Sequence, residues 1–311
     1  MDWIHYYGHE CQRTNGIDLL GDSNFCIKLT NDKSVSLQTE SGLESADVLW
    51  YRRWNRSRSL EAHIPVNEKM LHEDVISLVK SEFDGLTRAL FFAMNKQKWD
   101  DTPEYIQDYP IKMKQLEVAR SVGLLIPKTI VTNNKRDLQV FMQENHIENL
   151  IIKPIKNGTA ISSTEGTYVT YTSKVSESLS EVPDTFFPSL FQEAVIKEYE
   201  IRTFFYMEEC HSMAIFSARD EKTSVDFRNY NFEKPNRNVP YKLPDDVEAK
   251  IRNLMKSLNL ISGSIDILVN KSGDHIFLEV NAVGQFSMVS FPCNYYLERK
   301  LARSLILKQE K

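Results

Sequence analysis

The chain lacks the features that would place it in a membrane, outside the cell or on nucleic acid. No apolar run approaches the length needed to cross a bilayer, and the start at Met1 has neither the basic nor the apolar region of a secretion signal. The net charge of −5 gives no global attraction to nucleic acid or to anionic lipid. We therefore expect a cytoplasmic globular protein with no nucleic-acid partner and no membrane partner.

Cysteine is scarce, and the chain has no internal repeat and no low-complexity tract. Four cysteines occur without paired spacing, which argues against a disulfide framework and against a zinc site: Cys11, Cys26, Cys210 and Cys293. With 311 residues, of which 41% are hydrophobic and 26% charged, the chain can bury a sizeable core and is long enough for two or three subdomains.

The order of the predicted elements favours an α+β protein. Short strands with polar turns extend to about residue 60, a helical pattern follows from about Asn67, and Asp100–Pro103 breaks it. The middle of the chain is predicted to contain a helix over Ile111–Val122, a strand over Leu125–Val131, a helix capped by Asn133, a strand over Leu150–Lys153 and a mobile loop over Asn157–Gly166. The last part is predicted to contain an antiparallel sheet from Leu190–Ile196, Ile201–Met207 and Ser212–Ser217. Helices are predicted over Asp246–Leu258 and Tyr295–Leu307. Helices set apart around antiparallel sheets are typical of the α+β class.

Two alternating segments, Ser264–Asn270 and His275–Asn281, predict a β-hairpin with Lys271–Asp274 as its turn. This pairing sets Asp266 directly opposite Glu279, and strand periodicity puts Asn281 on the same face as Glu279. The other face is expected to enter a core with Ile265, Ile267, Ile276, Leu278 and Val280.

Opposed carboxylates on one ladder repel each other, so we expect a positive charge between Asp266 and Glu279. Three oxygen donors without a neighbouring His or Cys suit a hard ion such as Mg²⁺, which keeps waters and binds phosphate oxygens. The alternative is an ordinary hairpin whose carboxylates point into solvent.

Several cationic side chains stand where they can meet phosphate. Lys153 ends an apolar strand before a loop in which Gly158 lets backbone N–H groups approach an anion. Lys112 begins a helix, where a cation opposes the helix dipole unless an anion is held nearby. For both lysines the alternative is a solvated surface position.

The segment from Gln192 and Glu193 to Val195 is extended and has backbone groups that can pair with an adenine edge, while Glu200 can accept hydrogen bonds from ribose hydroxyls. Planar guanidinium groups that can bind a phosphoryl group or a carboxylate recur on or after the following strands: Arg202, Arg219 and Arg228. A further patch around Arg52 and Arg53 can stack on bases or clamp carboxylates or phosphates. The alternatives are structural ion pairs for the first three arginines and a solvated loop for the patch.

In order and spacing, these motifs resemble the ATP-grasp superfamily. More narrowly, the chain resembles the ATP-grasp peptide maturases that make graspetides, the microviridin-type peptides, and in particular their grasp-with-spasm branch. The narrower resemblance is carried by Trp50–Arg53, Val225–Arg228, Val283–Ser290 and Cys293–Glu298. It spans essentially the whole chain.

The resemblance implies an ATP-grasp fold with an N-terminal pre-ATP-grasp domain at 1–108, a central subdomain at 109–188 and a C-terminal subdomain at 189–311. It implies that Lys112 and Lys153 contact the phosphates of ATP, with Lys114 as the alternative to Lys112, because Asp108–Ile111 stands where relatives tend to have an Asn. The remaining implied roles are adenine binding by Gln192, Glu193 and Val195, ribose binding by Glu200, Mg²⁺ binding by Asp266, Glu279 and Asn281, catalysis by Arg202, Arg219 and Arg228, and peptide binding by Arg52 and Arg53.

The implied activity is an ATP-dependent macrocyclase that phosphorylates Asp or Glu side chains of a ribosomal precursor peptide and joins them to Thr or Ser hydroxyls or Lys amines. A homodimer is also implied. Two other functions stay open: a carboxylate-amine ligase acting on an amino acid or small molecule, and a nucleotide-binding regulator without turnover. We expect that replacing Asp266 or Glu279 by Ala abolishes turnover and leaves the fold largely intact, since it relieves repulsion.

Overall fold

The computed structural model describes residues 1–15, 24–52, 73–94, 98–100, 111–155, 160–163, 166–169, 172–175, 179–217 and 235–309. The chain divides into two units, one formed by Met1–Gln107 with Tyr296–Lys311 and the other by Asp108–Tyr295. None of the helices within the described residues is long and apolar enough to cross a membrane.

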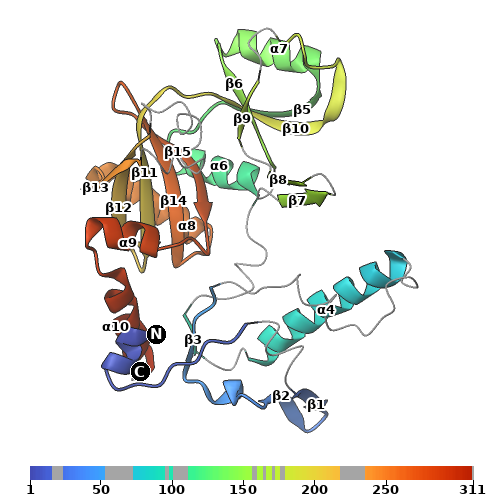
Figure 1. Ribbon diagram of the computed structural model, residues 1–311, viewed down its shortest axis with the longest axis vertical. Helices are drawn as coiled ribbons and strands as arrows, with labels where there is room; N and C mark the ends of the chain where they lie inside the picture. Colours follow the sequence, from blue (N-terminus) through green and yellow to red (C-terminus); the bar gives the residue numbers. More distant parts are fainter. Residues whose placement is uncertain are drawn as a thin grey trace. The chain divides into compact units, whose positions relative to one another are not determined.

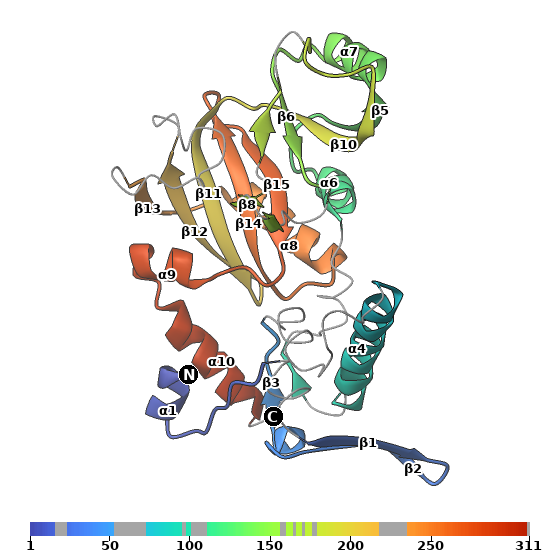
Figure 2. The ribbon, with the colours of Figure 1, turned by 45° about the vertical axis from the view of Figure 1, so that its right-hand side comes forward.

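The first unit joins the two ends of the chain. Its elements are α1 (Asp2–Tyr6), β1 (Phe25–Thr30), β2 (Lys33–Thr39), the 3₁₀ helix η1 (Leu43–Ser45), β3 (Val48–Leu49), α4 (Glu73–Ala93), β4 (Lys98–Trp99) and α10 (Leu297–Gln309). Strands β1 and β2 form an antiparallel ribbon (Figure 2), and β3 pairs with β4 in parallel. The core contains Leu90, Phe91 and Met94, which recur at helical spacing at the end of α4 and pack on Leu49.

Helix α10 is attached to this unit by charged side chains. Arg299 and Arg303 both donate from Nε to the Tyr7 hydroxyl, at 2.9 and 2.8 Å. Near the end of the helix Lys308 forms an ion pair with Asp100, which is only 4% exposed. The last helix of the sequence therefore supports the N-terminal part of the chain.

The second unit contains two antiparallel sheets, one of four strands and one of five. The four-stranded sheet has the order β5-β10-β6-β9, from β5 (Thr129–Asn134), β6 (Leu150–Lys153), β9 (Ser173–Lys174) and β10 (Thr185–Glu193). Helix α7 (Lys135–Glu144) covers it (Figure 1), with Leu138 packed beside Leu150 and Phe191 in a common core. Two further strands, β7 (Ala160–Ser163) and β8 (Gly166–Val169), pair with each other.

The five-stranded sheet has the order β13-β12-β11-β14-β15. Its strands are β11 (Lys197–Tyr206), β12 (Glu209–Phe216), β13 (Arg237–Tyr241), β14 (Ser262–Asn270) and β15 (His275–Asn281). Helices α8 (Asp245–Ser257) and α9 (Ser287–Cys293) lie on opposite faces of this sheet (Figures 1 and 2). On the α9 face Met213 and Ile215 pack against Val289, whereas on the other face Gly263 is closely approached by Met255 of α8.

Helix α6 (Lys112–Ser121) lies along the edge strand β15. The Phe277 N–H donates to the Leu125 carbonyl at 2.8 Å, and the Val280 N–H donates to the Gln115 side chain at 2.9 Å. The outer edge of the sheet is thus held by the helix and by the segment that follows it.

Several sequence-based expectations are corrected by these elements. Strand β10 pairs with β5 and β6 and belongs to a different sheet from β11 and β12. The cap of α7 is Asn134, whose side chain accepts from the Arg136 N–H at 2.8 Å, and not Asn133. The expected loop over residues 157–166 includes strand β7 and the start of β8. Helix α9 was not expected.

Candidate active site

The hairpin of β14 and β15 forms as the sequence predicts. Its turn is held by the Asn270 side-chain oxygen, which accepts from the N–H groups of Ser272 and Asp274 at 3.0 and 2.9 Å. Gly273 adopts φ of +83°, a left-handed conformation that glycine takes without steric cost. Asp266 pairs directly with Glu279, and Ser264 with Asn281, so both carboxylates and the amide emerge on one face.

A bulge interrupts the hairpin next to the carboxylates. The register passes from Asp266 opposite Glu279 to Ile267 opposite Phe277, which leaves Leu278 as an extra residue. The bulge changes the parity of the strand, so Phe277 faces the core with Ile267 and is fully buried. Ile276 is buried as expected, but it pairs with Leu268 on the Asp266 side of β14 and not beside Val280. Leu278, the bulged residue, is only partly buried, so the expectation that it faces the core is wrong.

Each carboxylate has its own cationic partner. Arg202, which is the β11 neighbour of Asp266, donates from Nη1 to both oxygens of Asp266 at 2.6 and 2.7 Å. The Lys112 ammonium lies 3.2 Å from Glu279 Oε2, and these side chains are 14% and 26% exposed. Repulsion across the ladder is thus offset by two side chains, so it does not by itself require a metal ion.

The surroundings of Asp266 oppose its ionisation. Burial raises the pKa of this carboxyl to about 6, with a further increase from the charge of Glu279 and a partial decrease from Arg202. A bound dication would favour the ionised form. The pair is therefore chemically suited to a cation even though Arg202 and Lys112 already contact it.

The donor set fits a magnesium ion in its chemistry. No group of three or more His, Cys, Asp or Glu side chains gathers around a point among the described residues. The set is instead two carboxylates and one amide, which is sufficient for an ion that retains waters and binds phosphate oxygens. The Asn281 side-chain oxygen also accepts from the Val283 N–H at 3.2 Å, which orients it at the end of β15.

The segment after Asn281 approaches β14 very closely. A Cβ atom on Gly284 would lie 2.1 Å from Ser264 Oγ and 2.7 Å from the Ser264 backbone nitrogen. Only glycine fits there, so Gly284 keeps the segment between β15 and α9 against the strand that carries Asp266.

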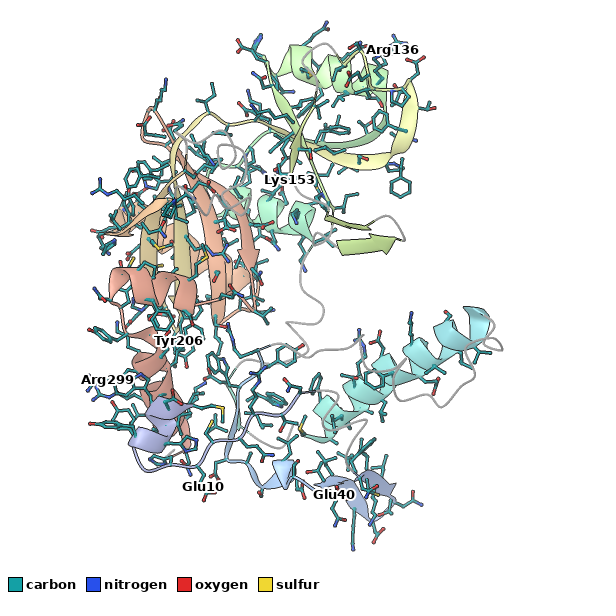
Figure 3. The ribbon with its side chains drawn as sticks, viewed as in Figure 1. Glu10, Glu40, Arg136, Lys153, Tyr206 and Arg299 are labelled. Atoms are coloured by element: carbon teal, nitrogen blue, oxygen red, sulfur yellow. The ribbon has the colours of Figure 1, made fainter. Side chains whose placement is uncertain are left out.

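Apart from Lys112 on α6, the expected nucleotide-binding residues lie at the end of β6, at the end of β10, and from there into the first half of β11. Lys153 is the last residue of β6, opposite Leu190 of β10 (Figure 3). Gln192 is buried, and its side chain donates to the Thr129 hydroxyl at 3.0 Å. The Glu193 N–H donates to the Lys128 carbonyl, whereas the Val195 N–H makes a bond to the Glu193 carbonyl at 3.1 Å, two residues back. The Val195 N–H is therefore less firmly committed than the Glu193 N–H.

Glu200 is buried and already engaged. Its Oε1 accepts from the Ser217 hydroxyl at 2.7 Å and forms an ion pair with Lys197. A role in ribose binding would therefore depend on its second oxygen. Lys197 was not singled out from the sequence, because residues three apart on a regular strand point to opposite faces. An irregularity in β11 between Lys197 and Tyr199 brings Lys197 and Glu200 to the same face.

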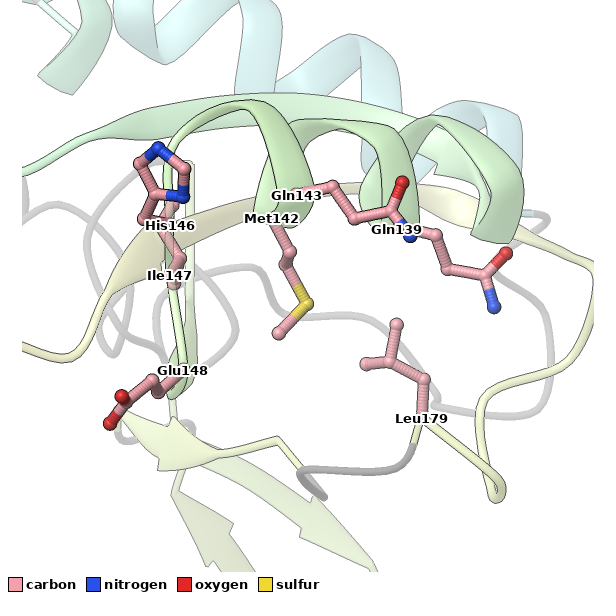
Figure 4. A pocket seen from close by; sticks show the side chains of 7 residues that line it. All are labelled: Gln139, Met142, Gln143, His146, Ile147, Glu148 and Leu179. Carbon is pink, nitrogen blue, oxygen red and sulfur yellow. The ribbon is translucent and has the colours of Figure 1, made fainter.

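The remaining predicted residues fall elsewhere. Arg52 belongs to the first unit, where its guanidinium lies 4.9 Å from the Trp50 ring centroid. Arg53, Arg219 and Arg228 lie outside the described residues. A pocket on the α7 side of the four-stranded sheet (Figure 4) contains none of the predicted site residues; it is lined by Gln139, Met142, Gln143, His146, Ile147, Glu148 and Leu179.

Gln115 is a further residue that the sequence pattern did not single out. It is a polar side chain only 2% exposed, at a buried position of α6 beside Leu116 and Ala119. Its place on the apolar stripe of the helix was the available signal.

Comparison with protein-family models finds no match, and no curated protein matches the chain. Solved structures match almost its whole length. A RiPP-associated ATP-grasp ligase from Chryseobacterium gregarium, solved with ADP and a leader and core peptide, is 23% identical, with a TM-score of 0.82 over 99% of this chain and 91% of that one. The chain has the ATP-grasp fold.

Two other solved structures match over nearly the same length. The macrocyclase MdnC from Microcystis aeruginosa MRC, bound with precursor peptide MdnA, is 23% identical, with a TM-score of 0.77 over 98% of this chain and 93% of that one. The ATP-grasp ligase PsnB with a minimal precursor, Mg and ADP is 18% identical, with a TM-score of 0.73 over 99% and 92%. At these identities the likeness establishes the fold, as the sequence motifs predict.

Proposed function

We propose that the protein is an ATP-dependent peptide macrocyclase of the graspetide type. One observation carries the proposal. Asp266 and Glu279 are paired across a hairpin and contacted by Arg202 and Lys112, in a chain that has the ATP-grasp fold over nearly its whole length. Similar structures include ligases solved with leader, core or precursor peptides, which favours a peptide as the substrate.

In this proposal ATP is bound by the second unit. Lys112 and Lys153 contact the phosphates, the backbone around Gln192, Glu193 and Val195 meets adenine, and Glu200 holds the ribose. The Val195 N–H donates only to the Glu193 carbonyl two residues back, at 3.1 Å, and this local bond can be exchanged for one to a base edge, which supports the adenine site. Lys114 is the alternative to Lys112, and the 3.2 Å contact of Lys112 with Glu279 favours Lys112.

Asp266, Glu279 and Asn281 would hold Mg²⁺, which supplies charge neutralisation for the phosphate oxygens when bound. Arg202 orients Asp266 through two hydrogen bonds from one nitrogen. Lys112 holds Glu279 on the side of β15 that faces α6. These contacts fix both carboxylates before a substrate arrives, which is the preorganisation that phosphoryl transfer requires.

The reaction has two steps. An Asp or Glu carboxylate of the precursor peptide attacks the γ-phosphorus of ATP, and the bond to the β-phosphate oxygen breaks, giving an acyl phosphate and ADP. A Thr or Ser hydroxyl, or a Lys amine, then attacks the acyl carbon; it loses its proton and inorganic phosphate leaves. Arg202, with Arg219 and Arg228, is proposed to stabilise the negative charge of the phosphorylated carboxylate.

Arg52 and Arg53 are proposed to bind acidic groups of the peptide. Cytoplasmic location, a homodimer and the division into domains at 1–108, 109–188 and 189–311 remain predictions. Ring closure benefits when the enzyme holds both ends of the forming ring, because this turns a rare encounter into an oriented one.

The proposal is tested with purified protein, ATP, Mg²⁺ and a precursor peptide rich in Thr and Glu. We expect the peptide to lose the mass of one water for each ring, with one ADP released per ring. Asp266→Asn should abolish this change, whereas Asp274→Asn, in the exposed turn of the same hairpin, should leave it intact. A gain of acceptor mass would indicate a carboxylate-amine ligase. Nucleotide binding without phosphate release would indicate a regulator, and either result would reject the macrocyclase.

A further inference from the structure

Gln115 joins the helix that carries Lys112 to the strand that carries Glu279. Its side-chain oxygen accepts from the Val280 N–H at 2.9 Å, and the residue is only 2% exposed. The bond spans 165 positions of sequence, between α6 and the edge strand β15. A buried amide used in this way is an attachment between two elements.

The attachment lies beside the ion pair of the candidate site. Lys112 and Gln115 are three residues apart on α6, so both side chains point from the same face of the helix. On β15, Val280 follows Glu279 directly, and Lys112 lies 3.2 Å from Glu279 Oε2. The bond from Gln115 to Val280 therefore fixes the turn of helix from which the ammonium reaches the carboxylate.

The bulge in β15 sets the spacing of the two attachments. Along a regular edge strand, outward N–H groups recur every two residues, but those used here belong to Phe277 and Val280, three residues apart. The extra residue, Leu278, accounts for the difference. The Phe277 N–H binds the backbone carbonyl of Leu125, whereas the Val280 N–H depends on a side chain, so this second attachment can be removed by substitution.

We propose that Gln115 is a positioning residue of the nucleotide-phosphate site, acting through Lys112. This inference rests on one part of the proposed function, namely that Lys112 binds the phosphates of ATP. Gln115 itself touches neither phosphate nor peptide. Its side-chain oxygen holds α6 against β15, so that the Lys112 ammonium is already placed when Mg·ATP binds.

The test is a double-mutant cycle on Mg·ATP affinity, measured by calorimetry with Gln115→Met, Lys112→Met and the double variant. Methionine keeps the length of the glutamine side chain but lacks the amide oxygen that accepts from the Val280 N–H, and its sulfur is only a weak acceptor. We expect either single substitution to raise the dissociation constant about tenfold. Because Gln115 acts through Lys112, the double variant should bind as weakly as Lys112→Met alone, whereas independent roles would give additive losses.

Leu116→Ala is the matched control, because it removes buried volume from the same helix without touching the hydrogen bond. It should lower the melting temperature and leave Mg·ATP affinity unchanged. If Gln115→Met does not fold, Gln115→Asn replaces it, since this variant keeps the amide but is one methylene too short to reach Val280. Additive losses in the cycle, or unchanged affinity in the Gln115 variant, would show a packing role and overturn the proposal.

The experiments distinguish failure of the macrocyclase proposal from failure of the proposal for Gln115. A wild-type chain that binds Mg·ATP but modifies no peptide leaves the cycle fully interpretable, so the role of Gln115 is still decided. A wild-type chain that binds no Mg·ATP overturns both proposals.

Discussion

At the scale of single residues, Asp266 and Glu279 are opposite each other but differ in what their removal leaves behind. Asp266→Ala removes the carboxylate that pairs with the Arg202 guanidinium, which is buried because Arg202 is only 9% exposed. Glu279→Ala removes the carboxylate that pairs with Lys112, whose ammonium is on a flexible side chain and can turn toward water. We expect Asp266→Ala to lower the free energy of unfolding by about 1–3 kcal/mol, and Glu279→Ala by less than about 1 kcal/mol. This revises the expectation from sequence that relief of repulsion leaves the fold intact in both.

Urea denaturation of the two variants measures this difference, and turnover of both should be lost. Asp266→Asn is the control, since it keeps the shape of the side chain and a hydrogen-bond acceptor for Arg202. Equal stability of Asp266→Ala and the wild type would mean that relief of repulsion fully offsets the loss of the ion pair, and would contradict this prediction.

Gly284 is a second residue whose chemistry is dictated by contact. Alanine there would bring its Cβ to 2.1 Å from Ser264 Oγ and 2.2 Å from Ser264 Cβ. We expect Gly284→Ala to cost at least about 1–3 kcal/mol of unfolding free energy and to weaken Mg·ATP binding, because the segment after Asn281 must move. Adding Ser264→Gly to Gly284→Ala should restore stability only in part, since the new Cβ would still lie 2.7 Å from the backbone nitrogen of residue 264.

The matched control is Gly85→Ala in helix α4. A Cβ on Gly85 meets nothing within 4 Å, so alanine should stabilise the helix by about 0.5–1 kcal/mol. Thermal unfolding of both variants distinguishes a steric effect at Gly284 from a general response to the loss of glycine.

At the scale of elements, the sequence predicts what depends on local pattern. The hairpin, its turn at 271–274 and the opposition of Asp266 and Glu279 follow from alternation, and helix α6 follows from helical spacing. The bulge at Leu278 does not, because an extra residue in a strand has no signature in an apolar alternation. The sheet that β10 joins was also missed, since the partner of a strand is set by contacts far along the chain.

The candidate site shows the same division. The residue types and their faces were predictable, whereas the pairing of Arg202 with Asp266 and of Lys112 with Glu279 depends on the packing of β11 and α6 around the hairpin. Helix α9 was missed because Pro292 and small polar residues weaken its helical pattern.

Helix α10 gives a prediction about an element. Lys308 forms an ion pair with Asp100, whose side chain has no exposed surface, so Lys308→Met removes one cation from a buried carboxylate. We expect a loss of about 1–3 kcal/mol in the first unit, seen as a lower melting temperature. Adding Asp100→Asn to this variant should restore part of the lost stability. Lys271→Met, at an exposed turn, is the control and should leave the melting temperature unchanged. An unchanged melting temperature for Lys308→Met would mean that α10 is held by Arg299 and Arg303 alone.

At the scale of the whole molecule, the candidate residues are unevenly divided between the two units. Every described residue proposed to bind nucleotide or metal lies within Asp108–Tyr295, whereas Arg52, proposed to bind peptide, lies in the other unit. If the proposed assignments hold, ATP and peptide should bind in different units. This separation permits a measurement that shows which unit binds Mg·ATP.

Hydrogen exchange with mass spectrometry provides this measurement. Mg·ATP at about 100 times its dissociation constant adds about 2.7 kcal/mol to the stability of the state that binds it. We expect Mg·ATP to slow exchange in α6, β11 and the β14–β15 hairpin, because these elements carry the proposed phosphate and metal ligands. Exchange in the ribbon of β1 and β2 should not change. Asp266→Asn should remove this protection, since the metal is lost from the site. Protection confined to the ribbon would place the nucleotide in the first unit and contradict the assignment of Asp266, Glu279 and Lys112.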